Sequence, residues 1–172
     1  MKSLVVYSTL TGNTRKIAEA LAEALPPGAE CFNLRDAPEP EAYDLILPGF
    51  WVNRGQADQA SLAYLEKIKG QKVVFFFTLG AYPDSGHADE VAADTERRLS
   101  ENGNQVLGHF RCQGKVDPEL LEKMKKMLPP DHPHAQMTPE RQARLEEAAR
   151  HPNEDDLARA RRFIADLLAR TA

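Results

Sequence analysis

Residues 4–14, LVVYSTLTGNT, decide the fold. Four apolar residues are followed by seven that place four hydroxyl side chains, an asparagine and a glycine before an amphipathic stretch. An uninterrupted apolar run is typical of a strand that is buried on both faces of a sheet. The segment NTRKIAEALAEAL, at 13–25, repeats apolar residues at helical spacing and stops at Pro26, Pro27 and Gly28. The chain therefore opens with a buried strand, a polar turn and a helix.

The same alternation continues along the chain. Further strands are predicted at AECFNL, YDLILPGF, KVVFFFTLG and QVLGHFRC, which are residues 29–34, 43–50, 72–80 and 105–112. Helical patterns occupy 61–70 and 86–102, and a last helix is expected after Asn153, which can cap it. Strands that alternate with helices predict a parallel sheet joined by crossover helices. We therefore expect an α/β fold in which a five-stranded parallel sheet carries helices on both faces.

Residues 113–152 break this alternation. They hold two helical patterns, PELLEKMKKML at 118–128 and PERQARLEEAAR at 139–150, separated by PPDHPHAQMT. Strand-like alternation does not occur in this stretch. We expect a helical insertion before the last helix of a single domain that spans residues 1–172.

Composition restricts the class of protein. A length of 172 residues with 42% hydrophobic content fits one domain with a full core. A net charge of −4 argues against a nucleic-acid partner, which would need a clustered basic face. The longest apolar run, VVFFFTLGAY, is too short to cross a bilayer, so we expect no membrane partner. Cys31 and Cys112 lie far apart in apolar stretches, which predicts reduced thiols in a cytoplasmic protein.

The polar turn at 8–14 has the chemistry of a phosphate site. A helix N-terminus presents unpaired N–H groups and a partial positive charge, so a bound phosphate needs no lysine. Gly12 would let the backbone approach a ligand closely. The same residues would also form an ordinary helix start capped by Thr or Asn, and local composition alone does not decide between the two. The Gly-Lys-Ser/Thr ending of a nucleoside-triphosphate loop does not occur here.

The stretch VVYSTLTGNTRKIAEAL, at 5–21, resembles the flavodoxin signature. The resemblance implies a flavodoxin-like three-layer sandwich with strand order 2-1-3-4-5, covering residues 1–112 and the final helix. It also implies that the turn binds the 5′-phosphate of FMN through Thr9, Leu10, Thr11, Gly12, Asn13 and Thr14. Leu10 and Gly12 would contribute only backbone N–H groups. Leu10 and Arg15 depart from the polar residue and the glutamate that are common in the family.

Two further segments resemble the flavin-binding loops of flavodoxins, PGFWVNRGQAD at 48–58 and TLGAYPDSGHAD at 78–89. A flat apolar ring is held well between aromatic faces at the carboxyl ends of neighbouring strands, although either aromatic alone would equally cover the sheet end. The expected contacts are Phe50, Trp51, Val52, Gly55, Thr78, Leu79, Gly80 and Tyr82. Phe50 and Val52 are alternatives to Trp51 for the ring contact, and Gly55 is the expected flipping peptide, with Gly49 second. Arg54, if it faced the ring, would make the flavin easier to reduce.

The leading interpretation is an FMN-binding protein that passes single electrons between a reductase and a partner redox enzyme. The flavin would perform the chemistry, so we expect no catalytic side chain. The alternative is an FMN-dependent NAD(P)H:quinone or acceptor oxidoreductase, because the fold does not decide between them. A third possibility is an interaction domain without flavin.

Three short segments carry a closer resemblance. FRCQGKVDP at 110–118, HPHAQMTPER at 132–141 and HPNEDDL at 151–157 resemble the flavodoxin-family proteins that accompany bilirubin reductase in gut bacteria. That resemblance implies a bilin reductase, or another flavin reductase, as a partner. Asp131, His132 and His134 could suggest a metal site, but their proline-rich surroundings indicate a surface loop, and we expect no metal.

Overall fold

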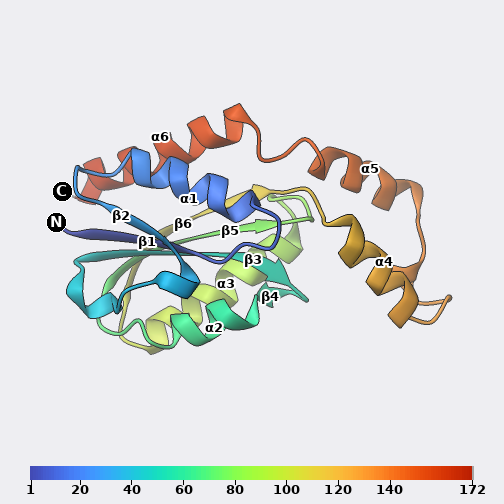
Figure 1. The fold of residues 1–172 in the computed structure, drawn as a ribbon, viewed down its shortest axis with the longest axis horizontal. Helices are drawn as coiled ribbons and strands as arrows, with labels where there is room; N and C mark the ends of the chain where they lie inside the picture. The colour runs from blue at the N-terminus through green and yellow to red at the C-terminus, as the bar shows by residue number, and fades with distance from the viewer. Residues whose placement is uncertain (172) are drawn as a thin grey trace.

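The computed structural model describes residues 1–171 and has a parallel sheet at its centre (Figure 1). The strands run β2-β1-β3-β5-β6 across the sheet, and each pairs in parallel with its neighbours. Their bounds are β1 Ser3–Tyr7, β2 Glu30–Asn33, β3 Leu45–Asn53, β5 Lys72–Leu79 and β6 Gln105–Gln113. The predicted order 2-1-3-4-5 is confirmed. The labels differ because β4, Gln56–Ala57, is a short antiparallel addition to β3 that the sequence pattern did not indicate.

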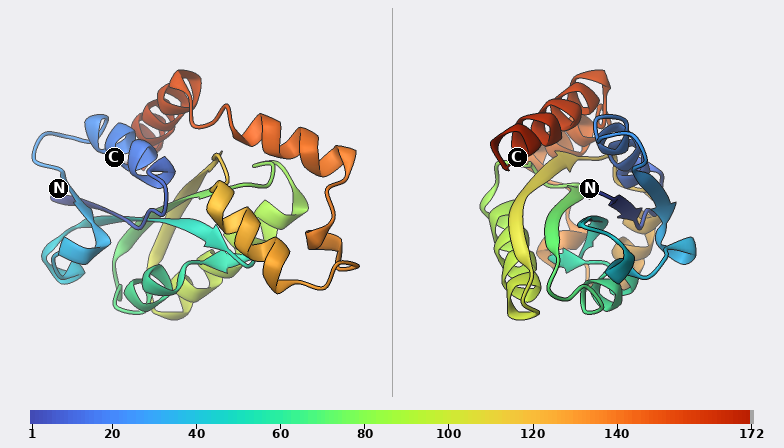
Figure 2. Two further views of the ribbon diagram at one scale, coloured as in Figure 1. Left: turned by 45° about the vertical axis from the view of Figure 1, so that its right-hand side comes forward. Right: turned by 90° about the vertical axis from the view of Figure 1, so that its left-hand side faces the viewer.

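Helices cover both faces of the sheet (Figure 2). One face carries α1, Asn13–Glu23, and α6, Glu154–Thr171, while the other carries α2, Gln59–Leu65, and α3, Gly86–Glu101. Side chains of β1 alternate between the two layers: Leu4 and Val6 pack with α2 and α3, and Val5 packs with α1 and α6. The three-layer sandwich therefore follows from strands that are apolar on both sides. Short 3₁₀ turns at Leu34–Asp36 and Pro40–Ala42 follow β2.

The predicted cap of the last helix is confirmed. The Oδ1 atom of Asn153 accepts a hydrogen bond from the N–H of Asp156 at 3.1 Å. The carboxylate of Asp156 accepts in return from the N–H of Asn153 at 2.9 Å. This reciprocal pair satisfies N–H groups at the start of α6 and sets the point at which the chain rejoins the sheet layer.

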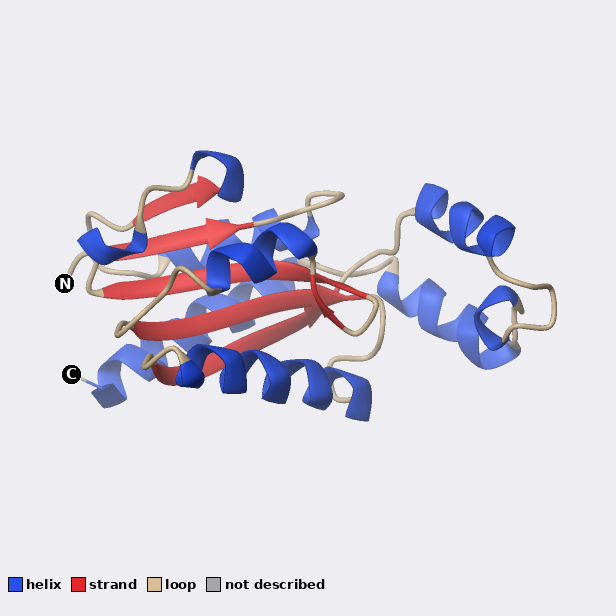
Figure 3. Cartoon of the chain, turned by 90° about the horizontal axis from the view of Figure 1, so that it is seen from below, coloured by secondary structure: helices blue, strands red, loops and turns tan. Residues whose placement is uncertain are grey.

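The segment between β6 and α6 is helical, as predicted, and extends beyond the carboxyl edge of the sheet (Figure 3). It contains α4, Pro118–Met127, the 3₁₀ turn η3, Pro133–Ala135, and α5, Pro139–Ala148. We call residues 114–151 the arm. Every residue of α4 is at least partly exposed, so this helix contributes little to the core.

Two kinds of feature are absent from residues 1–171. No helix in this range has the length and apolar character needed to cross a bilayer. The same residues contain no group of three or more His, Cys, Asp or Glu side chains arranged to hold a metal ion. His132 and His134, which were considered for a metal, lie around η3 in the arm.

We expect Gly49→Ala to destabilise the protein by about 2–3 kcal/mol, because a Cβ at this position of β3 would overlap the buried ring of Phe76. Gly86→Ala is the matched control, since a Cβ there meets open space at the start of α3. That control should be neutral or up to about 1 kcal/mol more stable, because alanine has the higher helix propensity. Urea unfolding followed by circular dichroism checks both values. Equal stability of the two variants would contradict this description of the core.

Candidate functional site

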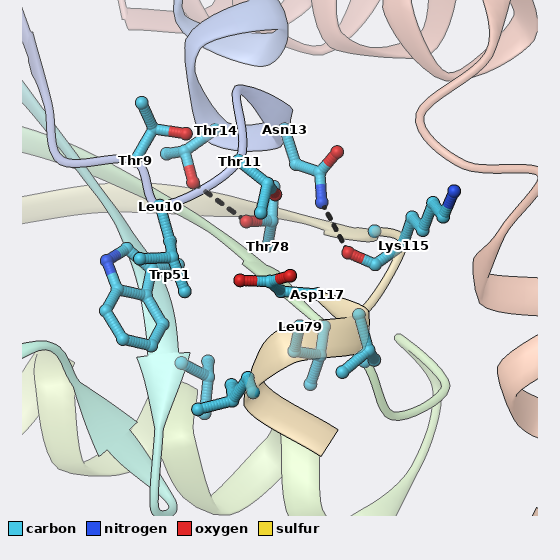
Figure 4. A pocket seen from close by; sticks show the side chains of 15 residues that line it. Thr9, Leu10, Thr11, Asn13, Thr14, Trp51, Thr78, Leu79, Lys115 and Asp117 are labelled. Atoms are coloured by element: carbon cyan, nitrogen blue, oxygen red, sulfur yellow. Dashed lines mark hydrogen bonds between the residues drawn. The ribbon is translucent and has the colours of Figure 1, made fainter. Parts of the chain in front are cut away.

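A cavity lies at the carboxyl edge of the sheet, between the start of α1, the ends of β3 and β5, and the start of the arm (Figure 4). Its volume is about 70 Å³. The structure brings ten of the predicted site residues together in its lining: Thr9, Leu10, Thr11, Asn13, Thr14, Trp51, Val52, Thr78, Leu79 and Gly80. These residues come from three separate stretches of sequence. The predicted convergence of the turn and the two strand ends is therefore observed.

The N-terminus of α1 is open to an anion. Gly12 precedes the helix in the left-handed conformation, with φ of 95°. Within residues 1–171, no side chain caps α1 and no acidic residue lies in its first turn. Other helices carry side-chain caps from Asp58, Ser85, Asp117 and Thr138. The alternative considered from the sequence, an ordinary helix start capped by a Thr or Asn side chain, is therefore not observed. The first N–H groups of α1 are left for another acceptor, which fits a phosphate.

Side-chain hydroxyls shape the turn. The Oγ1 of Thr9 accepts a hydrogen bond from the N–H of Gly12 at 2.9 Å. The hydroxyls of Thr14 and Thr78 are both buried and lie 2.8 Å apart, which joins the start of α1 to the end of β5. Thr11, by contrast, is exposed and lines the cavity. Of these threonines, Thr11 is the one best placed to offer its hydroxyl to a ligand.

Asp58 fixes the spacing between the turn and the hairpin after β3. This carboxylate is buried, with 4% of its surface exposed. It accepts a hydrogen bond from the Ser8 hydroxyl at 3.0 Å and from the Ser61 hydroxyl at 2.7 Å. Its own N–H donates to the carbonyl of Trp51 at 3.2 Å. One residue therefore connects the first residue of the turn, the strand that carries Trp51 and the start of α2.

Trp51 and Val52 border the cavity, whereas Phe50 lies in the core. The sequence pattern predicts that this strand ends at Phe50 and that Trp51 lies in the following loop. That prediction is wrong, because β3 extends to Asn53 and includes Trp51. Because side chains alternate along a strand, Phe50 points to the opposite side from Trp51. The Phe50 ring is fully buried and stacks on Phe77 at 5.4 Å. Of the two alternatives to Trp51, only Val52 lines the cavity.

Arg54 and Gly55 form the tip of a tight hairpin. Asn53 pairs with Gln56, so these two residues make the connection between β3 and β4. Their φ angles are 51° and 82°, and positive values at both positions are typical of a type I′ turn. Both residues are exposed and lie outside the cavity lining. Arg54 therefore does not line the cavity in which the flavin ring is expected, and the predicted effect of Arg54 on flavin reduction loses its premise.

Tyr82 lies beside a different cavity. It is 40% exposed and lines a space of about 660 Å³ together with His151 and Arg159. The loop after β5 therefore reaches the first cavity through Leu79 and Gly80, and turns Tyr82 toward the base of the arm.

The arm supplies a wall of the first cavity that was not predicted. Its contributing residues are Gly114, Lys115, Val116, Asp117 and Leu120. The Nδ2 of Asn13 donates to the carbonyl of Lys115 at 2.9 Å, so this amide fastens the arm to the turn. Gly114 allows the contact, because a Cβ there would lie 2.7 Å from Asn13 Nδ2. The sequence contained one indication of this wall. The end of β6 must lie at the same edge of a parallel sheet as the ends of β3 and β5, so the residues that follow β6 begin beside the cavity.

The base of the arm is fixed by a network around His151. Its Nδ1 lies 2.6 Å from Oδ2 of Asp156, and its Nε2 lies 2.9 Å from Oε1 of Glu147. Arg159 also pairs with Asp156. Burial alone would lower the pKa of His151, but the hydrogen bonds to the two carboxylates outweigh burial and raise that pKa. The N–H of Lys115 donates to the His151 carbonyl at 3.1 Å, so the network holds the two ends of the arm together.

Comparison with known proteins gives matches over nearly the whole chain. A family model described as Flavodoxin domain matches residues 4–165. A flavodoxin-like domain-containing protein BilS from Clostridioides difficile (strain CD3) is 32% identical over 178 residues, covering 100% of this chain and 99% of the relative. The BilS protein of Clostridium symbiosum (strain WAL-14163) is 28% identical, covering 95% of this chain and 94% of the relative.

A solved structure has the same fold. Oxidised flavodoxin 1 from Bacillus cereus superposes with a TM-score of 0.61 at 18% identity, covering 98% of each chain.

We expect His151→Gln to remove a pH-dependent part of the stability. The raised pKa of His151 means that its contribution is complete below about pH 6.5 and is lost as the pH rises through the folded-state pKa. The free energy of unfolding of the wild type should therefore fall between pH 6 and pH 9 more steeply than that of the variant. At pH 6 the variant should be roughly 1–3 kcal/mol less stable, because the buried Asp156 loses a partner.

Urea unfolding at several pH values checks this expectation. His134→Gln is the control, since His134 is exposed within the arm and should leave the slope unchanged. Parallel pH profiles for the wild type and His151→Gln would contradict the assignment.

Proposed function

The chain belongs to the flavodoxin family, and from that membership we propose that it is a one-electron carrier that holds FMN in the cavity at the carboxyl edge of its sheet. Membership of this family implies that the cofactor is FMN. When bound, it supplies the redox chemistry, while the protein supplies binding, orientation and electrostatics. The single observation that carries the proposal is the uncapped start of α1, which opens into the same cavity as Trp51.

The residues present fit the cofactor at both of its ends. The first N–H groups of α1 and the exposed hydroxyl of Thr11 would hold the phosphate. Trp51, Val52 and Leu79 would border the apolar ring. Leu10 is 51% exposed and also lines the cavity, so an apolar surface lies at its mouth. We propose that a redox partner approaches the flavin at this surface.

The finer assignment concerns the partners. We propose that electrons arrive from a reductase and leave to a partner redox enzyme, with a bilin reductase or another flavin reductase as the acceptor. The support is the resemblance carried by residues 110–118, 132–141 and 151–157, which lie in or beside the arm. The arm would then be an insertion in a single domain, because both layers of the core pack on one sheet and the arm leaves and rejoins it between β6 and α6.

We also propose a cytoplasmic location. Cys31 and Cys112 are free thiols, and such thiols persist in reducing compartments. Burial raises the pKa of Cys31 to about 11 and that of Cys112 to about 12. Both thiols are therefore held in the protonated form, which reacts slowly.

A second candidate is an FMN-dependent NAD(P)H:acceptor oxidoreductase. The cavity of about 660 Å³ beside Tyr82 favours it, because a space of this size between the loop after β5 and the arm matches that of small-molecule sites. The carrier remains the leading proposal, since the lining of the first cavity supplies donors for a phosphate and apolar contacts for a ring, which is all that an electron carrier needs of its protein.

We expect Thr11→Ala to raise the dissociation constant for FMN about tenfold, because one hydrogen bond to a charged phosphate is lost. Riboflavin lacks the phosphate, so its dissociation constant should change less than twofold. Titrations followed by flavin fluorescence, and by quenching of the single tryptophan, measure both constants. Thr171→Ala is the control, since Thr171 lies near the end of α6. Equal affinity of the wild type for FMN and riboflavin would argue against a phosphate site at the turn.

Mixing the FMN-loaded protein with NADH or NADPH under anaerobic conditions separates the two candidates. A carrier depends on a separate reductase, so the flavin absorbance near 450 nm should persist for many minutes without one. Addition of a flavodoxin reductase with NADPH should then bleach it. Bleaching within seconds by a nicotinamide alone would reject the carrier and support the oxidoreductase.

A further inference from the structure

The start of the arm brings a carboxylate into the cofactor cavity. Asp117 lines the cavity, and Figure 4 shows its carboxylate on the same side as Thr11 and Thr78, with the Lys115 amine directed away. The Oδ1 of Asp117 accepts a hydrogen bond from the N–H of Glu119 at 3.0 Å, so Asp117 also caps α4. A negative side chain therefore shares a small cavity with the donors proposed to hold a phosphate dianion.

At the start of the arm, Gly114 and Lys115 make the backbone hydrogen bonds to other parts of the structure. The N–H of Gly114 donates to the Leu79 carbonyl at 2.9 Å. Lys115 is held on two sides, because its carbonyl accepts from Asn13 and its N–H donates to the His151 carbonyl. Beyond this point, no residue of α4 is fully buried, and the helix extends past the sheet (Figures 1 and 3). Helices that bury little surface move at low free-energy cost, so α4 can move relative to Lys115 with a change in backbone conformation between Lys115 and Asp117.

Asp117 and Leu120, from the first turn of α4 and the residue before it, form part of the wall of the cavity in which FMN is proposed to bind. The enclosed part of that cavity is small, about 70 Å³. A carboxylate close to a phosphate dianion in a partly desolvated site opposes binding electrostatically. The charge of Asp117 therefore disfavours a bound phosphate for as long as the start of α4 keeps this position.

We propose that Asp117 is a built-in competitor of the FMN phosphate, and that α4 moves outward when FMN binds, while the two ends of the arm stay fixed around His151. The inference rests on the proposed function, since it requires FMN in this cavity. The position of α4 would then differ between the FMN-bound protein and the FMN-free protein. A partner that contacts the arm would meet a different surface on the loaded protein.

Asp117→Asn tests the charge. Asparagine is as good a helix cap as aspartate, so α4 should persist while the negative charge is removed. The dissociation constant for FMN should fall at least about tenfold, and that for riboflavin should change less than twofold, because riboflavin carries no phosphate. Glu119→Gln is the matched control: it removes the same charge from the same turn of α4, but Glu119 is exposed and lies outside the cavity lining. Both constants should stay within twofold for this variant.

Limited trypsin digestion of the wild type tests the movement. Saturating FMN should speed cleavage at Lys123, Lys125 and Lys126 of α4 several-fold, while cleavage within the sheet layer slows. Circular dichroism and the melting temperature establish that each variant is folded.

The inference needs both results. An unchanged FMN affinity in Asp117→Asn, an equal gain for riboflavin, or unchanged cleavage of α4 would each overturn it and leave FMN binding in place. Failure of both the wild type and Asp117→Asn to bind FMN would overturn the proposed function itself.

Discussion

The left-handed conformation of Gly12 is the constraint on which the functional edge of the molecule depends. It turns the chain from β1 into α1 so tightly that the Gly12 N–H is taken by Thr9 and the Thr14 hydroxyl is buried against Thr78. The first N–H groups of α1 are then left facing the end of the sheet. A residue with a Cβ would be strained by about 1–2 kcal/mol in this conformation. The open helix start follows from that turn, and Asn13, the next residue, contributes to the position of the arm through its hydrogen bond to the Lys115 carbonyl.

The sheet could be predicted because its signals are local. β1 is apolar at consecutive positions since both of its faces are covered, and α1 and α6 show one apolar stripe each since one side of each helix is buried. The end of β3 could not be predicted in the same way. Its last residues are held by pairing with β4, and Arg54 adopts a positive φ that few residues other than glycine favour. The register of this strand decides that Trp51 faces the cavity and that Phe50 does not.

The wall formed by the arm depends on contacts between residues that are distant in sequence. The sequence motif places Asn13 among the phosphate ligands, yet its amide is used by Lys115, 102 positions later. Local sequence patterns do not predict a contact between residues so far apart. The sequence around Asp117 indicates only that this residue caps a helix. The turn and the two strand ends were therefore predictable as one site, while the residues that close the site were not.

Asp58 has a consequence for which nucleotides the molecule can accept. Because this buried carboxylate binds Ser8 and its backbone binds Trp51, the turn proposed to hold the phosphate and the residue proposed to border the ring are held at a constant separation. In the proposed FMN site, this separation would have to match the length of the ribityl chain. A molecule whose charged end and aromatic end are spaced as in FMN would span it, whereas a ligand with a different spacing would satisfy only one of the two ends.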